Sequence, residues 1–560
     1  MPQIKQEPRL KIIPLGGLEE VGRNMTVFEY DRDIVIVDMG LQFPEEDMPG
    51  IDYVIPDVSY LKGKENYIRG VIVTHGHYDH IGAIPHIMSK IGNPTIFTAK
   101  LTQAIIQKRQ EDYKEQGKLN IYTVDPDKDN LQLGSFKVEF FRVNHNIPDG
   151  FGLVLHSPVG SVMHTGDFKF DPAPVGEKPT DIEKIKKFGQ RGIKVLMSDS
   201  TGSEIEGDSI SEQSIMETLD QIIKGNKNRI IIATFSSLLT RIQQIIMLAE
   251  KYGRKVAIQG YSMKSNVEIA KKLGYLKAQK GTLISPKEMK DLPKEKIIVA
   301  CTGAQGEERA VLMRIANKEH REIKLIKDDT VIFSSSVVPG NERTVQRLKD
   351  SLTRQGAELF HYKMMDVHTG GHALRDDLKR MIQMTKPEYF VPIHGNHYML
   401  KIHGDLAAEV GTPRQNIFVP DNGHVMEFTK TTGEITKKKV PSNHVMVDGL
   451  GIHDSSNVVI RDRQMLAKDG MFVVIATIDS KTGKLVGNPD LISRGFIYMK
   501  ESKRLVEQTR KKVRKIVESK KDDSAANYTY LKNKIRDDIG QFLYSKTERR
   551  PMVLPVVIEV

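Results

Sequence analysis

Short apolar runs that end in polar residues dominate residues 10–200 of the chain. They read LKIIPLGG, DIVIVDMG, GVIVTHG, FKVEFFRVNH, GSVMHTGD and IKVLMSDS. Runs of this length that are rich in Val, Ile and Phe predict β-strands. Because strands that end in polar side chains place those side chains at one edge of a sheet, we expect a functional site at that edge.

The pattern changes after about residue 210. RIIIATF, LLTRIQQIIMLAEKYG and KVAIQGY alternate strand, helix and strand, which predicts a parallel α/β unit. KIIVACTG and DTVIFSSSVVPG continue this unit to about residue 345. Apolar runs followed by histidine return after residue 360, and they predict strands in MMDVHTGGHA and YFVPIHGNH. We therefore expect the chain to leave a first domain, build a second one and return to the first.

A third region begins at about residue 445 and ends in RRPMVLPVVIEV, a predicted final strand. Within it, residues 501–521 carry nine Lys or Arg residues against three Glu, with apolar residues near helical spacing. This pattern predicts an amphipathic helix with a basic face. A basic face is either solvated or a contact for nucleic acid, and charge alone leaves both readings open.

The overall composition limits the class of protein. A chain of 560 residues is expected to form several domains, and 39% hydrophobic with 28% charged residues is ordinary for a globular protein. Neither an apolar run of roughly 18 residues nor a secretory signal is recognisable, so we expect no membrane span. The single cysteine, Cys301, excludes an intrachain disulfide and agrees with a reducing cytoplasm. The net charge of +11 weakly favours an anionic partner.

The stretch THGHYDHIG concentrates side chains that can bind metal. His75, His77, Asp79 and His80 fall within six positions, at the end of one predicted strand and before the predicted helix HIGAIPHIMSK. Imidazole and carboxylate groups are the ligands of catalytic zinc sites, which also leave room for water. A single histidine is more often structural than a ligand, but four candidates in one loop predict metal binding. The first two can serve one metal ion and the last two a second ion.

Further candidate ligands end other predicted strands. They are His145, Asp167 and His394, and each alone would be an ordinary loop residue. Together they would complete seven ligands, with Asp167 between two metal ions, and such a pair activates water to attack a phosphodiester. Asp38, which ends DIVIVDMG, is expected to orient a histidine ligand from behind. A simple strand cap is the alternative role for Asp38.

The motifs resemble those of known hydrolases. HGHYDH with VNH, HTGD and a distal histidine resembles the metallo-β-lactamase signature. The inserted unit and the two late histidine motifs resemble the β-CASP subgroup, which acts on nucleic acids. PLGGLEEVGRNM, FPEEDMPGIDYVIPD, CTGAQGEERAVLMRIA, DLISRGFIYMKES and KTERRPMVLPVVIEV resemble the ribonuclease J family, from about residue 10 to the C-terminus.

The resemblance implies an architecture and an activity. It implies an α/β fold: a metallo-β-lactamase αββα sandwich at 1–208 and 361–445, a β-CASP α/β domain inserted at 209–360, and a small α+β domain at 446–560. It implies a cytoplasmic ribonuclease with two Zn²⁺ per subunit, Mn²⁺ or Mg²⁺ being further ions that support activity. The family degrades single-stranded RNA as 5′-to-3′ exonuclease and endonuclease, in mRNA turnover and rRNA maturation. Its members form dimers and tetramers, largely through the C-terminal region, so further copies of the chain and RNA-decay or ribosome-associated proteins are expected partners.

The resemblance also assigns roles to residues. The metal ligands that it implies are His75, His77, Asp79, His80, His145, Asp167 and His394, of which Asp79 also counts as catalytic. His372 matches a histidine that assists the leaving group as general acid. The implied substrate-binding residues are Ser236, Ser237, Leu238, His368, Thr369, Gly370, Gly371 and His372. In HTGGH, the glycine N–H groups and the N-terminus of the predicted helix ALRDDLKRMIQ suit a phosphate.

Three residues depart from the family pattern, and none of them is a ligand. The family often has Glu in place of Tyr78, Ser in place of Gly370 and Arg in place of Tyr261. We expect these differences to affect substrate preference rather than metal binding. Asp52 and Asp448 match positions where some members hold a structural calcium ion.

Three other functions are compatible with parts of the sequence. A β-CASP nuclease that acts on DNA would share the ligands. A small-molecule metallohydrolase would need neither the insertion nor the basic third region. A non-catalytic RNA-binding subunit of a ribonuclease complex would be expected to have lost ligands, whereas all seven are present.

If the third region drives assembly, deletion of residues 446–560 should convert oligomers into monomers. Light scattering on the full-length and shortened chains measures this directly. An unchanged molar mass per particle, after allowance for the deleted residues, would contradict the assignment.

Overall fold

The computed structural model of the chain describes residues 8–45, 47–307, 309–338, 340–449, 451–453, 457–519 and 526–560. Contacts divide the chain into two compact units. The first comprises Met1–Gln42 and Ile55–His444, and the second comprises Phe43–Val54 and Val445–Val560. The domain limits expected from the sequence at residues 208, 360 and 445 remain predictions.

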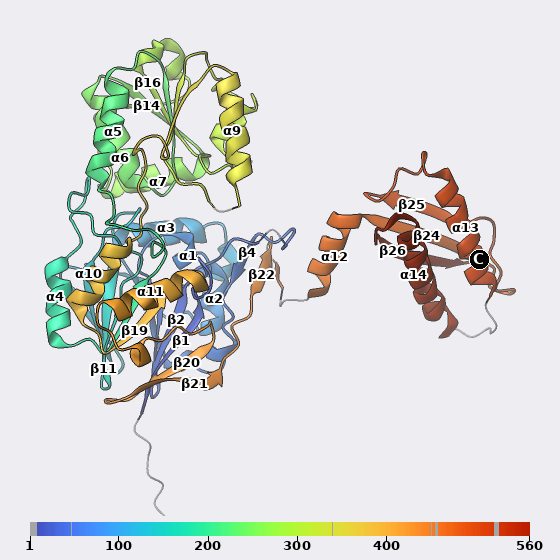
Figure 1. Cartoon of the computed structure of the whole chain (residues 1–560), viewed down its shortest axis with the longest axis horizontal. Helices are drawn as coiled ribbons and strands as arrows, with labels where there is room; N and C mark the ends of the chain where they lie inside the picture. Colours follow the sequence, from blue (N-terminus) through green and yellow to red (C-terminus); the bar gives the residue numbers. More distant parts are fainter. Residues whose placement is uncertain are drawn as a thin grey trace, which may run out of the picture. The chain divides into compact units, whose positions relative to one another are not determined.

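Two β-sheets form the centre of the first unit (Figure 1). The first has the order β21-β20-β1-β2-β3-β5-β6-β7 and the second the order β19-β12-β11-β10-β9-β8. The strands of the first are β1 (Leu10–Gly16), β2 (Met25–Tyr30), β3 (Asp33–Val37), β5 (Ile68–Ile72), β6 (Ile96–Thr98), β7 (Ile121–Thr123), β20 (His424–Phe428) and β21 (Gly433–Lys439). The strands of the second are β8 (Asn130–Leu133), β9 (Phe136–Arg142), β10 (Phe151–Ser157), β11 (Gly160–His164), β12 (Val195–Asp199) and β19 (Tyr389–Ile393).

The core of this unit follows from the alternation of side chains along the strands. Leu10 and Phe28 of the first sheet pack in one cluster with Phe140, Leu153 and Val391 of the second. The outer face of the second sheet carries another buried cluster, to which the helices α4 (Ile182–Arg191), α10 (Arg375–Thr385) and α11 (His397–Glu409) contribute. Helices therefore cover the second sheet on the face turned away from the first, as the sandwich requires.

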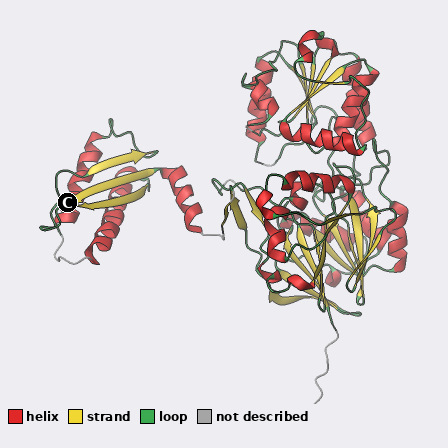
Figure 2. Ribbon diagram, turned by 180° about the vertical axis from the view of Figure 1, so that it is seen from behind, coloured by secondary structure: helices red, strands yellow, loops and turns green. Residues whose placement is uncertain are grey.

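The chain between the two halves of the sandwich builds a third sheet. Its order is β15-β14-β16-β13-β17-β18, and every pair in it is parallel. Its strands are β13 (Ile230–Ala233), β14 (Lys255–Gln259), β15 (Leu283–Ile284), β16 (Ile297–Cys301), β17 (Thr330–Phe333) and β18 (Glu358–His361). Its helices are α5 (Glu212–Lys224), α6 (Leu239–Lys251), α7 (Tyr261–Leu273), α8 (Val311–Ala316) and α9 (Glu342–Arg354), seen on its two sides in Figure 2. The predicted parallel α/β unit is confirmed, and the central strands are apolar throughout because both faces are covered.

Two local predictions are wrong. HIGAIPHIMSK is not one helix but two short ones, α1 (Tyr78–Ile81) and α2 (Ile84–Ile87), followed by a 3₁₀ turn at Met88–Ile91. The chain bends at Ala83, whose N–H bonds to the carbonyl of Met39 at 3.0 Å. MMDV forms turns rather than a strand, because the Val367 carbonyl accepts from Arg241 and Ser334 instead of from a neighbouring strand.

The second unit contains the C-terminal region. The sheet β25-β24-β26, with β24 (Met471–Ile478), β25 (Asp490–Arg494) and β26 (Met552–Glu559), packs against α13 (Lys503–Glu518) and α14 (Ala526–Thr547). A smaller sheet joins β4 (Tyr53–Ile55), β22 (Val445–Asp448) and β23 (Gly451–His453), and α12 (Asn457–Asp469) follows it.

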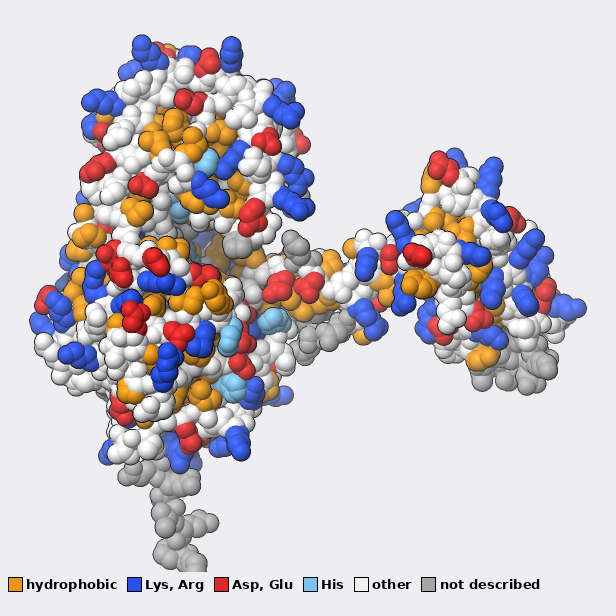
Figure 3. All heavy atoms as spheres, viewed as in Figure 1, with side chains coloured by type: hydrophobic (Ala, Val, Ile, Leu, Met, Phe, Trp, Pro, Cys, Tyr) orange, Lys and Arg blue, Asp and Glu red, His pale blue; other side chains and the backbone are white. Residues whose placement is uncertain are grey.

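The basic amphipathic helix expected in 501–521 is α13, while residues 520 and 521 lie outside the described residues. Val506, Val513, Ile516 and Val517 are buried against the sheet, which leaves the basic side chains on the other face. Lys and Arg side chains are spread over the visible face of this unit in Figure 3. None of the helices in the described part of the chain has the length and apolar character needed to cross a membrane.

A buried ionic network joins the inserted sheet to the sandwich. Arg241 of α6 is fully buried, and its guanidinium donates to Glu212 at 2.8 Å and to the Val367 carbonyl at 2.7 Å. Lys169, also buried, places its Nζ 3.5 Å from a Glu212 oxygen. Burial raises the pKa of Glu212, but Arg241 and Lys169 outweigh burial and lower that pKa to about 2. Glu212 is therefore an anion held between two cations.

We expect Arg241→Met to lower the free energy of unfolding by about 3–5 kcal/mol, because it leaves the Glu212 charge buried beside one distant cation. Urea denaturation followed by circular dichroism measures the loss. The matched control is Arg414→Met, which removes an exposed pair with Asp405 and should cost less than about 1 kcal/mol. Equal losses for the two variants would contradict this account of the network.

Candidate metal centre

The loop that carries the first four candidate ligands is fixed by its backbone. It follows β5, and residues of the adjacent segment donate to it: Met39 N–H to the His80 carbonyl at 2.8 Å, and Leu41 N–H to the Tyr78 carbonyl at 3.0 Å. A Cβ on Gly40 would lie 1.5 Å from the Asp79 carbonyl oxygen, so only glycine permits this approach. The loop is thus held in place independently of any bound ion.

Three imidazoles converge in a first group formed by His75, His77 and His145. His77 Nδ1 lies 3.1 Å from His75 Nε2 and 3.0 Å from His145 Nε2. His145 Nδ1 donates to the Gly371 carbonyl at 2.6 Å, so its Nε2 turns a lone pair toward the group. Burial lowers the pKa of His77 to about 4 and those of the other two well below the usual value. Neutral rings with converging lone pairs fit a metal cation between them.

A second group contains Asp79, His80, Asp167 and His394. His80 Nε2 lies 3.3 Å from Asp167 Oδ2 and 3.5 Å from Asp79 Oδ2, and His394 Nε2 lies 3.2 Å from the same Asp79 oxygen. Burial lowers the pKa of His80, but Asp167 and Asp79 outweigh burial and raise it well above the usual value. These surroundings stabilise positive charge, which a bound cation would supply.

Asp167 lies between the two groups. Its Oδ2 is 3.7 Å from both His75 Nε2 and His145 Nε2, in addition to its contact with His80. Ligands on a tetrahedral ion with bonds of about 2.0–2.1 Å are about 3.4 Å apart, so these separations suit shared ions. The structure therefore brings together all seven side chains that the sequence predicted as ligands.

Asp38 lies behind the second group. One of its oxygens accepts from His80 Nδ1 at 2.8 Å, and the other accepts from the Thr74 N–H at 2.8 Å. Asp38 therefore both contacts a histidine and caps the end of a strand. Its φ of 63° and the φ of 55° at His394 are left-handed conformations that non-glycine residues rarely adopt. Such conformations persist where the surrounding structure imposes them, often at functional sites.

Sequence reasoning missed Asp199 and Thr201. Asp199 ends β12, with one oxygen 2.8 Å from His372 Nδ1 and the other 3.4 Å from His394 Nδ1. Thr201 Oγ1 lies 2.8 Å from the same His394 nitrogen. The signal for Asp199 was present, because the apolar run in IKVLMSDS leads into Asp199 just as other apolar runs lead into Asp38 and Asp167.

His372 is set beside the second group by Asp199. Burial lowers the pKa of His372, but Asp199 and Asp167 outweigh burial and raise it above the usual value. With Nδ1 directed at Asp199, the other ring nitrogen is available on a side chain that is 23% exposed. An imidazole in this position can hold a proton near neutral pH and still reach a bound molecule.

The remaining residues of HTGGH differ in exposure. Gly370 is exposed, and a Cβ there would meet nothing within 4 Å. A Cβ on Gly371 would lie 2.6 Å from the His145 ring, so glycine is required at that position. Thr369 Oγ1 donates to the Ile210 carbonyl at 3.0 Å, and His368 is buried with its ring 5.9 Å from that of Phe235.

The contact between Phe235 and His368 places the Ser-Ser-Leu segment beside HTGGH. Ser236 and Ser237 are half-buried, whereas the Leu238 side chain is fully buried. Leu238 is therefore covered, and its N–H and carbonyl are bonded to Phe235 and Ile242.

The two tyrosines that differ from the family pattern, Tyr78 and Tyr261, are exposed. The Tyr78 ring is 44% exposed and lies under the Arg109 guanidinium, 4.7 Å from it. Tyr261, the first residue of α7, is 81% exposed. Both rings can be reached by a bound molecule, while Tyr78 leaves the ligand set intact.

Comparisons with known proteins cover most of the chain. Residues 18–218 match the family described as Metallo-beta-lactamase superfamily, and residues 227–352 match Ribonuclease J, beta-CASP domain. Residues 362–420 match Zn-dependent metallo-hydrolase RNA specificity domain, and residues 458–560 match Ribonuclease J C-terminal domain.

Full-length relatives are similar throughout. The chain is 38% identical over 556 residues to Ribonuclease J2 of Bacillus subtilis (strain 168), covering 99% of this chain and 100% of the relative. It is 39% identical over 547 residues to Ribonuclease J 1 of Streptococcus pyogenes serotype M3, covering 98% and 97%. A crystal structure of a protein of unknown function from Enterococcus faecalis V583 has a TM-score of 0.54 at 15% identity, over 75% of this chain and 100% of that one, which is a likeness of fold.

We expect His77→Ala to lower the zinc bound per chain, because it removes a ring nitrogen from the first group. Metal analysis of the purified protein by mass spectrometry measures the change. His156→Ala is the matched control, since His156 contacts Glu139 and Ser161 rather than the ligands. Unchanged zinc in the His77 variant would refute its role as ligand.

Proposed function

The chain belongs to the ribonuclease J family, and we propose that it is a zinc-dependent ribonuclease that degrades single-stranded RNA as both 5′-to-3′ exonuclease and endonuclease. As a member of this family it is a metallo-hydrolase nuclease, and it has a candidate His/Asp metal site. The observation that carries the proposal is the convergence of seven candidate ligands, with Asp167 at their centre, beside an open glycine turn and a protonatable histidine.

The metal ions would be held by two sets of residues. His75, His77 and His145 suit one ion, while Asp79, His80 and His394 suit the other, with Asp167 between them. Two bound ions supply an activated water and neutralise the charge of the attacked phosphodiester. The chain's part is to keep three imidazoles neutral by burial and to concentrate carboxylate charge on the second side.

The substrate would be oriented by HTGGH and the Ser-Ser-Leu segment. The exposed turn at Gly370 suits a backbone phosphate. The start of α10 does not add to it, because the N–H groups of Arg375 and Asp376 already donate to the carbonyls of Ile205 and Gly207. Ser236 and Ser237 would present hydroxyls nearby, and the buried Leu238 would hold their backbone in place. The two exposed rings, Tyr78 and Tyr261, can stack on bases.

His372 would act as general acid. Burial lowers the pKa of His372, but the Asp199 carboxylate outweighs burial and favours the protonated ring. The ring nitrogen opposite Nδ1 donates this proton to the oxygen that leaves the phosphorus. Asp199 holds the ring in one orientation through its 2.8 Å contact.

The wider biological role is inferred from family membership. We infer cytoplasmic action in mRNA turnover and rRNA maturation, as a dimer or tetramer that associates with RNA-decay or ribosome-associated proteins. Mn²⁺ or Mg²⁺ would support activity besides Zn²⁺. Structural calcium is left out of the proposal, because Asp52 accepts from the Gly449 N–H at 2.7 Å and Asp448 pairs with Arg463.

The match of residues 362–420 to an RNA specificity domain favours RNA over DNA, and the complete ligand set favours an enzyme over a binding subunit. One experiment separates these functions. The full chain is incubated with 5′-monophosphate, 5′-triphosphate and 5′-hydroxyl forms of one RNA and with single-stranded DNA of the same sequence. We expect mononucleotides and internal fragments from RNA and little product from DNA. Equal cleavage of DNA, or no cleavage of any RNA, would refute the proposal.

We expect His372→Ala to slow RNA cleavage by about 10²–10⁴-fold while zinc content stays normal. The same variant should hydrolyse bis(p-nitrophenyl) phosphate with a much smaller loss, because p-nitrophenolate leaves without protonation. Equal losses on both substrates would contradict the role of general acid. Loss of zinc would mean that His372 is a ligand instead.

A further inference from the structure

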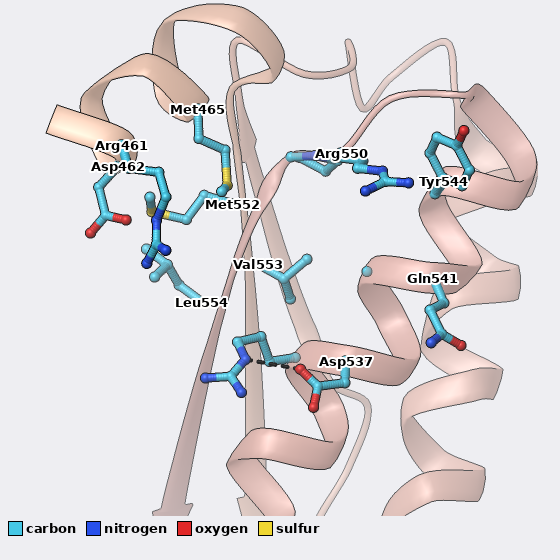
Figure 4. A pocket seen from close by; sticks show the side chains of 13 residues that line it. Arg461, Asp462, Met465, Asp537, Gln541, Tyr544, Arg550, Met552, Val553 and Leu554 are labelled. Carbon is cyan, nitrogen blue, oxygen red and sulfur yellow. Dashed lines mark hydrogen bonds and ion pairs between the residues drawn. The ribbon is translucent and has the colours of Figure 1, made fainter. Parts of the chain in front are cut away.

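The C-terminal unit contains a cavity that no part of the proposed reaction uses. Its volume is about 730 Å³, and it lies among α12, α14 and β26 (Figure 4). Figure 4 shows Arg461 and Asp462 on one side, Tyr544, Gln541 and Arg550 on the other, and Val553 between them. All of its lining residues belong to the second unit, so the cavity is complete within that unit.

The walls combine cationic groups, an aromatic ring and an apolar floor. Arg461, Arg536 and Arg550 line the cavity together with two carboxylates, Asp462 and Asp537. The floor consists of the apolar side chains Met465, Met552, Val553 and Leu554. This combination accepts a ligand with an anionic end and a flat, apolar end.

The cationic groups differ in how they are engaged. The Arg550 guanidinium lies over the Tyr544 ring at 4.5 Å, and Tyr544 is 43% exposed. Arg536 Nε contacts Asp537, its neighbour in the helix, at 3.0 Å, with both side chains more than half exposed. Arg461 is exposed and makes no ion pair within the described residues. Within the described part of the chain, Arg461 is therefore available to bind an anion. Arg550 and Tyr544 offer a planar guanidinium and a planar ring, on which a flat ligand could stack.

Gly540 is an independent sign that the cavity is kept open. It stands inside α14, where glycine destabilises a helix relative to alanine. Packing does not require it, because the nearest atom to an added Cβ, Val553 Cγ2, is 4.0 Å away. Residues four positions to either side, Arg536 and Tyr544, line the same cavity. A larger side chain at 540 would fill the space between them.

We propose that this cavity binds one ribonucleotide unit. The phosphate is bound by the guanidinium groups of Arg461 and Arg536, and the base lies against the apolar floor beside Tyr544 and Arg550. Asp462 offers oxygens that accept from the ribose hydroxyls. The choice of a ribonucleotide as ligand rests on the proposed function. The cavity itself, with its cationic and aromatic walls, is observed independently of that function. The unit is either a free nucleoside monophosphate or part of an RNA strand.

Isothermal titration calorimetry on the full chain tests the proposal. Adenosine 5′-monophosphate, inorganic phosphate, adenosine and a five-nucleotide RNA are the probes, with His77→Ala as the background for the RNA so that it is not consumed. The variants are Gly540→Leu, which fills the cavity, and Arg461→Gln, which removes its available charge. Lys511→Gln on α13 is the matched control, because it removes an exposed positive charge from the same unit outside the cavity.

We expect Gly540→Leu to abolish one class of nucleotide sites and Arg461→Gln to weaken that class about tenfold, the effect of losing one charge-assisted hydrogen bond. Lys511→Gln should bind as the parent does. Gly540→Ala should raise the melting temperature by about 2–4 °C, which shows that glycine at 540 does not serve stability. Tighter binding of the RNA than of the monophosphate identifies the ligand as a unit of RNA, and equal binding identifies a free nucleotide.

Unchanged binding in both cavity variants would overturn the proposal. Equal affinity for inorganic phosphate and the monophosphate would overturn it too, because the base would then contribute nothing. These outcomes are independent of cleavage. A chain that binds the nucleotide in this cavity but cleaves no RNA refutes the proposed function alone, and a chain that cleaves RNA but fails the titration refutes this inference alone.

Discussion

The buried carboxylate of Asp167 is the group on which the centre depends. It is only 3% exposed and lies within 3.3–3.7 Å of nitrogens from His75, His80, His145 and His394. Burial raises its pKa, but His394 and His80 outweigh burial and hold that pKa well below the usual value, so Asp167 is an anion. An anion at this depth is stable only among positive charges or metal ions. The neutral imidazoles lie on one side of Asp167, and the second carboxylate, Asp79, lies on the other. Both groups could therefore hold a cation next to the same buried anion.

The sheets determine where these side chains lie. β11, β12 and β19 are neighbouring parallel strands, so the residues that follow their carboxyl ends meet at one edge. Asp167, Asp199 and His394 come from these three ends. The HxHxDH loop arrives from the other sheet, where Gly40 allows the backbone to pass within hydrogen-bonding distance of the loop. The two sheets of the sandwich therefore each contribute part of one site, which explains why the ligands are far apart in sequence.

The inserted sheet is tied to the same site through buried charge. Arg241 connects Glu212 at the start of α5 with the carbonyl of Val367, the residue before HTGGH. Gly371, at the other end of that segment, accepts from His145 of the first ligand group. The proposed substrate segment is therefore bonded on one side to the inserted domain and on the other to a candidate metal ligand.

The sequence by itself determined the candidate ligands, most strands and the parallel character of the insertion. Periodicity and strand-end residues are local properties, so the order of residues alone is enough to select His75, His77, Asp79, His80 and Asp38. Tertiary structure alone decided which strand ends meet at the site. The positions of Asp199 and Thr201, and the contact of His145 with Gly371, depend on the order of strands in the sheet rather than on the spacing of residues along the chain. It also decided that MMDV is a turn and that the helix after the ligand loop is broken, since partners from other elements take the backbone groups there. The cavity at Gly540 was likewise decided only by the tertiary structure. It forms where α12, α14 and β26 come together, and the sequence does not show that Gly540 faces a space between them.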